Sequence, residues 1–260
     1  MIIDAHVHLG NSVAMYIYKD GARERIEYMD KTGCDYAIQS FCGGALNVHI
    51  DMKAHGAYVE RSKKLYEDTR GRIMTYLVYD PRMPEYCVKT IAENYSDPAF
   101  AGIKIHPSAH WTAGDDEGYR PVWEAAAKYD LPLLAHTWAL TSNPKQAFAT
   151  PDKFEKYLKE YHETKFIFGH SGGRISGIRE ATALGKKYKN SYFDIAGDIY
   201  DRGLVKYLVS QVGADRIMLA SDANWFEVTP AMGMVIGADI TENEKKLILG
   251  GTAAKLFKIA

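Results

Sequence analysis

Two histidines near the N-terminus are spaced so that they could share one ion. His6 and His8 lie in the run Ile2-Ile3-Asp4-Ala5-His6-Val7-His8, which has the composition of a buried strand. Residues i and i+2 of a strand point to the same face, so both imidazoles project in one direction, with Asp4 one step deeper. Neutral imidazoles are common ligands of divalent metals. Taken alone, such a pair is more often a hydrogen-bonded core pair.

Further polar residues follow other apolar runs of the chain. His106, His136, His170 and Asp222 each come after a short run that reads as a strand. Singly, such a histidine is usually a core residue, and such an aspartate a helix cap or turn residue. Three imidazoles and a carboxylate together suit a first-row divalent ion, most naturally Zn²⁺, with Mn²⁺ or Fe²⁺ as alternatives. A catalytic site of this kind leaves a position for water, whose pKa the ion lowers toward about 7.

These residues need elements that bring them together. Runs rich in β-branched and aromatic residues predict eight strands, at Met1–His8, Asp35–Ser40, Arg72–Tyr79, Ala101–His106, Leu131–Thr137, Lys165–His170, Ser191–Ile195 and Arg216–Ser221. Helical signals lie between them, at Ala22–Thr32 before Gly33, at Val122–Tyr129, at Phe154–Tyr161 with Asp152 as N-cap, and at Glu242–Leu249 before Gly250-Gly251.

Eight strand–helix repeats predict one closed (β/α)₈ barrel, a TIM barrel, which needs about 250 residues. We expect a single domain over residues 1–260, with the site at the C-terminal ends of the strands. An open doubly wound sheet is the alternative, but it predicts a glycine-rich loop after the first strand, where this chain has Leu9-Gly10-Asn11. The longest connection, Phe41 to about His55, follows the second strand.

Composition excludes several classes of protein. The 260 residues carry 32 basic and 33 acidic side chains, and 47% are hydrophobic, which excludes a disordered chain, a collagen and a coiled coil. A net charge of −1 gives no support for binding nucleic acid or a membrane surface. Cys34, Cys42 and Cys87 fit neither a disulfide framework nor a cysteine zinc site. With no signal peptide or apolar span in view, we expect a cytoplasmic protein with reduced thiols.

The ordered set of motifs resembles the amidohydrolase superfamily. The resemblance is closest to its amidohydrolase-2 branch, which includes aminocarboxymuconate-semialdehyde decarboxylase and related lactonases. It is carried by His6-x-His8, Gly102-Ile103-Lys104-Ile105-His106-Pro107, His136, His170, Ser221-Asp222 and the tail Leu249–Phe257, where Thr252 replaces the usual asparagine.

That resemblance implies roles for individual residues. Mononuclear members would use His6, His8, His136 and Asp222 as ligands, with His170 as the catalytic histidine. Binuclear members use a carboxylated lysine on the fourth strand, which here would be Lys104, and place the histidine of the sixth strand on the second metal. We favour one metal, because the Gly-x-Lys-x-His-Pro context resembles the mononuclear branch.

Other residues near these strand ends suit a substrate. Lys104 and His106 share a face, so Lys104 could instead pair with an inner carboxylate or meet a substrate carboxylate. Arg174, after Gly172-Gly173, could bind an anion, or could be a solvated arginine after a glycine turn. Trp138 could form the wall of a pocket for a planar or cyclic ligand, or could be a loop anchor or an oligomer contact. The same loops hold Trp111, Trp225, His110 and Asp198, the last as a helix cap or a residue near the site.

The expected activity is metal-dependent hydrolysis of a small, anionic amide, ester or lactone. Asp222 would take the water proton and return it to the leaving group, and His170 would orient the nucleophile or stabilise the oxyanion. A non-oxidative decarboxylase of an aromatic or unsaturated carboxylate is the main alternative. A metal-dependent nuclease or phosphatase and a non-catalytic metal-binding module are the others. The resemblance further suggests a homodimer or larger homo-oligomer.

Overall fold

The computed structural model describes residues 1–8, 21–40, 52–223 and 225–260. Cys42, the Leu9-Gly10-Asn11 segment and most of the connection predicted after the second strand lie outside these residues. Cys34 and Cys87 are buried and free. Among the described residues, no helix combines the length and the apolar character needed to cross a membrane.

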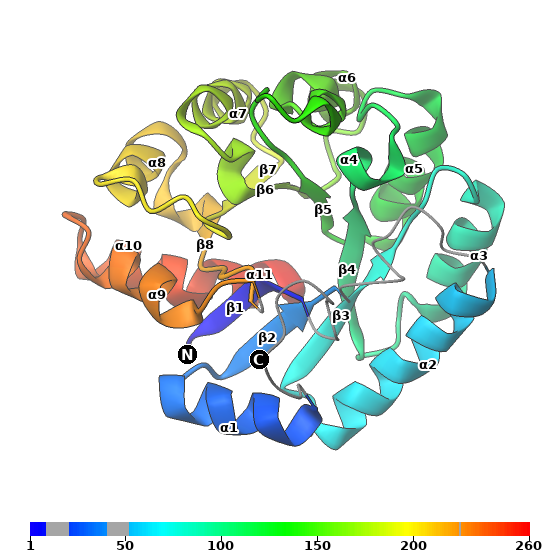
Figure 1. Cartoon of the computed structure of the whole chain (residues 1–260), viewed down its shortest axis with the longest axis horizontal. Coiled ribbons are helices and arrows are strands. Elements are labelled where there is room, and N and C mark those ends of the chain that lie inside the picture. Colours follow the sequence, from blue (N-terminus) through cyan, green and yellow to red (C-terminus); the bar gives the residue numbers. More distant parts are fainter. Residues whose placement is uncertain (9–20, 41–51, 224) are drawn as a thin grey trace.

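Eight parallel strands form one sheet in the order of the sequence, each pairing with the next. The chain just after the last strand returns to the first, since the amide of Ala5 donates to the carbonyl of Leu219 (3.0 Å) and that of Asp222 to the carbonyl of His6 (2.9 Å). The predicted (β/α)₈ barrel is therefore confirmed (Figure 1). The strands are β1 (Ile3–Val7), β2 (Tyr36–Gln39), β3 (Ile73–Val78), β4 (Phe100–Ile105), β5 (Leu133–His136), β6 (Phe166–Gly169), β7 (Ser191–Asp194) and β8 (Ile217–Met218).

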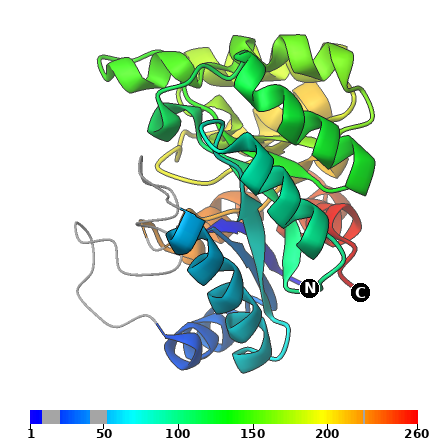
Figure 2. The ribbon, with the colours of Figure 1, turned by 90° about the vertical axis from the view of Figure 1, so that its right-hand side faces the viewer.

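Helices surround the strands, and both termini lie close together beside β1 (Figures 1 and 2). The α-helices are α1 (Ala22–Thr32), α2 (Met52–Asp68), α3 (Pro84–Asn94), α4 (Pro107–His110), α5 (Arg120–Tyr129), α6 (Glu155–Glu160), α7 (Ile175–Lys187), α8 (Leu204–Val212), α9 (Val228–Ile236), α10 (Glu242–Lys246) and α11 (Thr252–Phe257). Short 3₁₀ turns are η1 (Glu117–Tyr119), η2 (Pro144–Phe148), η3 (Pro151–Phe154), η4 (His170–Gly172) and η5 (Ala214–Arg216).

Two helix ends differ from the sequence prediction. Asp152 is not an N-cap, because Pro151 starts the 3₁₀ turn η3 one residue earlier and Asp152 lies inside it. Gly250 and Gly251 do not end a helix either, since a π-helical segment over Leu247–Gly251 joins α10 to α11. A Cβ on Gly250 would lie 2.5 Å from the carbonyl oxygen of Met1, so this glycine permits close packing on the start of the chain. By contrast, α1 has the predicted bounds and ends at Gly33 in the left-handed conformation (φ 75°).

The apolar core has two parts, separated by the strands. The larger part lies between strands and helices and holds Trp123, whose ring stacks on Phe166 at 4.9 Å. The smaller part includes Tyr76, Leu134, Ile167 and Met218. Leu134 lies two residues before His136 on β5 and so shares its face. Toward the C-terminal ends of the strands, the same inward-facing positions are therefore occupied by polar side chains, which form a layer next to the smaller cluster.

Candidate metal centre

Three predicted ligands come together from opposite ends of the chain. β1 supplies His6 and His8, and the segment after β8 supplies Asp222. Oδ1 of Asp222 lies 3.0 Å from Nε2 of His8 and 3.9 Å from Nε2 of His6. All three residues are buried, and their ligand atoms lie within 4.8 Å of one another. This is a group that could hold a metal ion.

Hydrogen bonds behind the rings determine which nitrogens face the group. Nδ1 of His6 lies 2.9 Å from Oδ2 of Asp194, and Nδ1 of His8 lies 2.8 Å from the carbonyl oxygen of Ser40. Both partners are acceptors, so each Nδ1 carries the hydrogen and each neutral ring directs an Nε2 lone pair toward Asp222. The Nε2 lone pair of His8 would repel the carboxylate of Asp222 at 3.0 Å unless a second ring proton or a cation lay between them. The donor set therefore fits a divalent ion.

His136 lies next to this group rather than inside it. Its Nδ1 is 3.1 Å from Nε2 of His170, and its Nε2 is 3.2 Å from Oε1 of Gln146. His170 in turn donates from Nδ1 to the carbonyl oxygen of Ala196 at 3.0 Å. The His170 ring also lies 5.1 Å from the His6 ring, so the histidines form a continuous cluster. The structure thus brings His136 to His170, and its role as a ligand stays a prediction.

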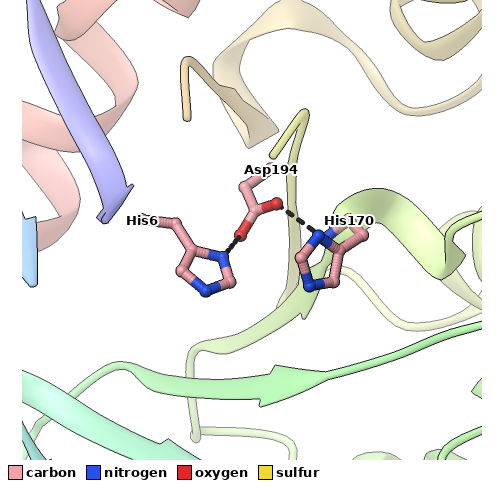
Figure 3. A group of neighbouring side chains, drawn as sticks. All are labelled: His6, His170 and Asp194. Carbon is pink, nitrogen blue, oxygen red and sulfur yellow. Dashed lines mark hydrogen bonds and ion pairs between the residues drawn. The ribbon is translucent and has the colours of Figure 1, made fainter. Parts of the chain in front are cut away.

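Asp194, at the end of β7, joins two members of the cluster (Figure 3). While Oδ2 accepts from His6, Oδ1 accepts from the backbone amides of His170 (2.6 Å) and Ala196 (3.1 Å). The bond to His170 supports an unusual backbone, since His170 and Ser171 have φ values of 59° and 48°. Sequence reasoning gave Asp194 no role. The available signal was its position, because it ends a strand as His136 ends β5.

The buried ligands have the protonation states that a metal requires. Burial, together with the charge of Lys104, holds the pKa of His6 well below its usual value. Burial and His170 do the same to the pKa of His136. Burial alone would raise the pKa of Asp222, but the contact with His8 and the electrostatic influence of the neighbouring imidazoles bring it below its ordinary range. Neutral imidazoles and an ionised carboxylate are the forms that bind metals.

Lys104 and His106 both face this cluster from β4, as their spacing predicts. Lys104 is buried, and its Nζ lies 2.9 Å from Nε2 of His6. The His106 ring stacks on that of His136 with centroids 4.1 Å apart and planes 11° apart. Lys104 therefore lies beside a metal-facing nitrogen, where its amine can interact with a bound substrate.

Trp138 and Arg174 form a wall beside the histidines. The Trp138 ring lies 5.9 Å from that of His136, with planes 2° apart, and meets His170 edge-on at 5.2 Å. Arg174 lies over the same indole at 4.8 Å and donates two hydrogen bonds to the carboxylate of Asp198, at 2.8 and 2.7 Å, and a third to its backbone carbonyl at 3.2 Å. Arg174 is exposed and pairs with the carboxylate of Asp198, so its expected contact with a substrate anion stays a prediction. Asp198 is the partner of Arg174 in this ion pair.

His110 belongs to a separate buried group. Its Nδ1 lies 2.7 Å from the hydroxyl of Tyr119, and its Nε2 has no hydrogen-bond partner among the described residues. Burial lowers the pKa of His110 to about 4, with Asp80 opposing and Arg82 reinforcing the shift. The ring is therefore neutral at physiological pH.

Residues 3–259 match the amidohydrolase family, so the chain belongs to that family. Searching the curated proteins gave no match. Among solved structures, 5-carboxyvanillate decarboxylase LigW from Sphingomonas paucimobilis is 16% identical, with a TM-score of 0.80, and the match covers 100% of this chain and 99% of that one. A 2,6-dihydroxybenzoate decarboxylase in complex with 2,6-dihydroxybenzoate is also 16% identical, with a TM-score of 0.78 and coverage of 99% and 98%.

A third similar structure holds a metal. It is a dihydroxybenzoic acid decarboxylase from a Polaromonas species with bound manganese and the inhibitor 2-nitroresorcinol, 18% identical, with a TM-score of 0.74 and coverage of 99% and 97%. At these identities the likeness establishes the shared barrel fold.

Replacing Asp194 by alanine should strongly destabilise the protein. The change leaves Nδ1 of His6 and the amides of His170 and Ala196 buried without their acceptor, which we expect to cost about 3–5 kcal/mol of unfolding free energy. Urea denaturation measures this. The matched control is Asp198→Ala, which removes an exposed ion pair and should cost less than about 1 kcal/mol. Equal losses in the two variants would contradict the role given to Asp194.

The stability of the protein should fall in acid partly through His110. The unfolded ring takes up a proton near its ordinary pKa of 6.5, whereas the folded ring resists protonation down to about 4. This contribution is therefore complete above pH 6.5 and is lost as the pH falls toward 4, by about 3 kcal/mol in total. Urea denaturation across this range should show a smaller acid loss in His110→Gln. An identical loss in both proteins would refute the assignment.

Proposed function

We propose that this protein is a metal-dependent lyase that releases CO₂ from a small aromatic or unsaturated carboxylate without oxidation. The observation that carries the proposal is the set of flat rings at the edge of the metal-binding group, where Trp138 lies parallel to His136 and edge-on to His170. A planar ring can pack there with its carboxylate at the metal. The similar structures support this choice, since three of them are decarboxylases of aromatic carboxylates. They favour decarboxylation over the hydrolysis that we expected first.

We assign one divalent ion to His6, His8, His136 and Asp222. Manganese is supported by the ion in the Polaromonas structure, and zinc by the nitrogen-rich donor set. Such an ion would withdraw electron density from the carboxylate and a neighbouring oxygen of the substrate. Proton transfer and stabilisation of the developing charge are carried out by side chains of the protein.

His170 supplies the proton in this proposal. Its Nδ1–H is committed to the carbonyl of Ala196, so the protonated form of the ring carries its second proton on Nε2, releases it toward the substrate and returns to the neutral form. As the bond to the carboxyl carbon breaks, its electron pair stays on the substrate carbon. That carbon takes the proton from Nε2, and CO₂ leaves. The cation of Lys104, buried at the same point, stabilises the negative charge that forms meanwhile.

Hydrolysis is the second candidate, and Asp222 favours it. This carboxylate is ionised and lies 3.0 Å from Nε2 of His8, so it can accept a proton from water at the metal. Both reactions use the same ligands and differ in whether water enters the product.

The two reactions are separated by following carbon and oxygen isotopes. The protein, loaded with Mn²⁺ or Zn²⁺, is incubated in H₂¹⁸O with hydroxybenzoates labelled with ¹³C at the carboxyl group, and with amides, esters and lactones. We expect ¹³CO₂ from a hydroxybenzoate and no ¹⁸O in the remaining aromatic product. Incorporation of ¹⁸O from an amide, ester or lactone, with no ¹³CO₂ from any carboxylate, would contradict the proposal and favour hydrolysis.

Variants then test the proton donor. His170→Asn should lower the rate of CO₂ release by about 10²–10⁴-fold. His162→Asn, which changes an exposed histidine elsewhere on the chain, should leave the rate unchanged. Undiminished turnover in His170→Asn would remove His170 from the mechanism.

A further inference from the structure

We propose that Gln146 is a positioning residue that fixes the tautomer of His136 and so directs the Nδ1 lone pair of that ring to the metal. The inference rests on the proposed function, because it assumes that the cluster binds a divalent ion. Gln146 lies on η2, in the connection after β5, and nothing in the sequence analysis pointed to it.

The contacts of the Gln146 amide define the tautomer. Its Oε1 lies 3.2 Å from Nε2 of His136 and accepts from the hydroxyl of Ser108 at 3.1 Å. A carbonyl oxygen has two lone pairs, so it can receive both hydrogens. Nε2 of His136 therefore carries the hydrogen, and Nδ1 keeps its lone pair.

The Nδ1 lone pair of His136 faces a second nitrogen lone pair, on His170. Nδ1 of His136 lies 3.1 Å from Nε2 of His170, which is also unprotonated in the neutral ring because Nδ1 of His170 donates to Ala196. Two lone pairs at this distance repel each other unless a cation or a proton lies near both. By fixing this tautomer, Gln146 leaves His136 with a lone pair on Nδ1 that is available to a cation.

Stacking alone leaves the choice of nitrogen open. The His136 ring is parallel to His106 on β4 and to Trp138, with planes 11° and 2° apart. These contacts hold the plane of the ring, but a half-turn about the Cβ–Cγ bond returns the ring to the same plane, with its nitrogens and carbons exchanged and the same stacking. Only a hydrogen bond at the ring edge distinguishes the two orientations, and Gln146 supplies it.

Neighbouring contacts hold Gln146 in place. Asn143 caps η2 by accepting from the amide of Lys145 at 3.1 Å. Phe148 meets the Trp111 ring at 6.1 Å, and Lys145 lies over the same ring at 4.7 Å. Together with the bond to Ser108, these contacts attach η2 to α4. Gln146 is consequently half-buried, although the adjacent Ala147 is exposed.

Each of the other histidines in the cluster also donates a hydrogen bond to a protein acceptor, but that acceptor is a backbone carbonyl or a carboxylate rather than a side-chain amide. His8 donates to the carbonyl of Ser40, His170 to that of Ala196, and His6 to the carboxylate of Asp194. Each acceptor fixes the tautomer of one ring, as acceptors behind metal-binding histidines generally do. Gln146 gives His136 the acceptor that the other rings obtain from strand ends.

Zinc affinity of the full chain, measured by competition with a chromogenic chelator, tests the inference. Gln146→Leu removes the acceptor and should weaken zinc binding by about 10–100-fold. Gln146→Glu keeps an acceptor at the same reach, so its affinity should match or exceed that of the wild type. Gln211→Leu, the same change at another half-buried glutamine, should have no effect. Thermal melts of each variant show whether it is folded.

Nitrogen-15 spectra of the zinc-loaded, histidine-labelled protein give a second readout. We expect His136, identified by its loss in His136→Ala, to carry its hydrogen on Nε2. Wild-type zinc affinity in Gln146→Leu, an equal weakening in Gln146→Glu, or a hydrogen on Nδ1 of His136 would each overturn the inference. If the wild type binds no zinc or manganese, the proposed function fails and the inference fails with it. Zinc binding that Gln146→Leu leaves unchanged overturns the inference alone.

Discussion

The carboxylate of Asp194 is the interaction on which the rest of the site depends. Asp194 ends β7, and its carboxylate accepts from the ring of His6 on β1 and from the backbone amide of His170, just after β6. The first bond fixes which nitrogen of His6 faces Asp222. The second holds the left-handed backbone at His170 and Ser171, from which the His170 ring reaches His136. One buried anion therefore orients both halves of the histidine cluster.

Barrel closure makes that arrangement possible. Asp222 follows β8, 216 residues after His6, yet its amide donates to the carbonyl of His6. Ser221 donates to the buried carboxylate of Asp4, with its amide 2.9 Å away, so the same two segments are joined once more below the site. These contacts bring the two ends of the chain into register, and the ligands of β1 and β8 meet as a result.

The sequence was sufficient for the fold because its signals are local. Buried strands of a parallel barrel are largely apolar on both faces, so runs such as Leu133–Ala135 and Phe166–Phe168 mark them directly. Placement of His6, His8 and Asp222 at one mouth then follows from the i, i+2 rule and the barrel. Helix ends were less predictable, since Gly250 serves close packing rather than termination.

The hydrogen bonds that fix the orientation of each histidine ring could not be predicted from the sequence. Asp194 and Gln146 act through contacts with residues 188 and 10 positions away, and neither lies in a recognisable motif. Arg174 was considered for substrate binding or solvent exposure, because no local pattern reveals its pairing with Asp198 or its contact with Trp138. Such contacts depend on how loops from different strands pack together.

Metal content tests the central claim most directly. The wild type and Asp222→Ala, purified without added metal, are compared by elemental analysis before and after exposure to Mn²⁺ or Zn²⁺. The account predicts about one tightly held ion per wild-type chain and far less in the variant. A wild-type protein that holds no divalent ion even after this exposure would contradict the metal centre and the chemistry proposed for it.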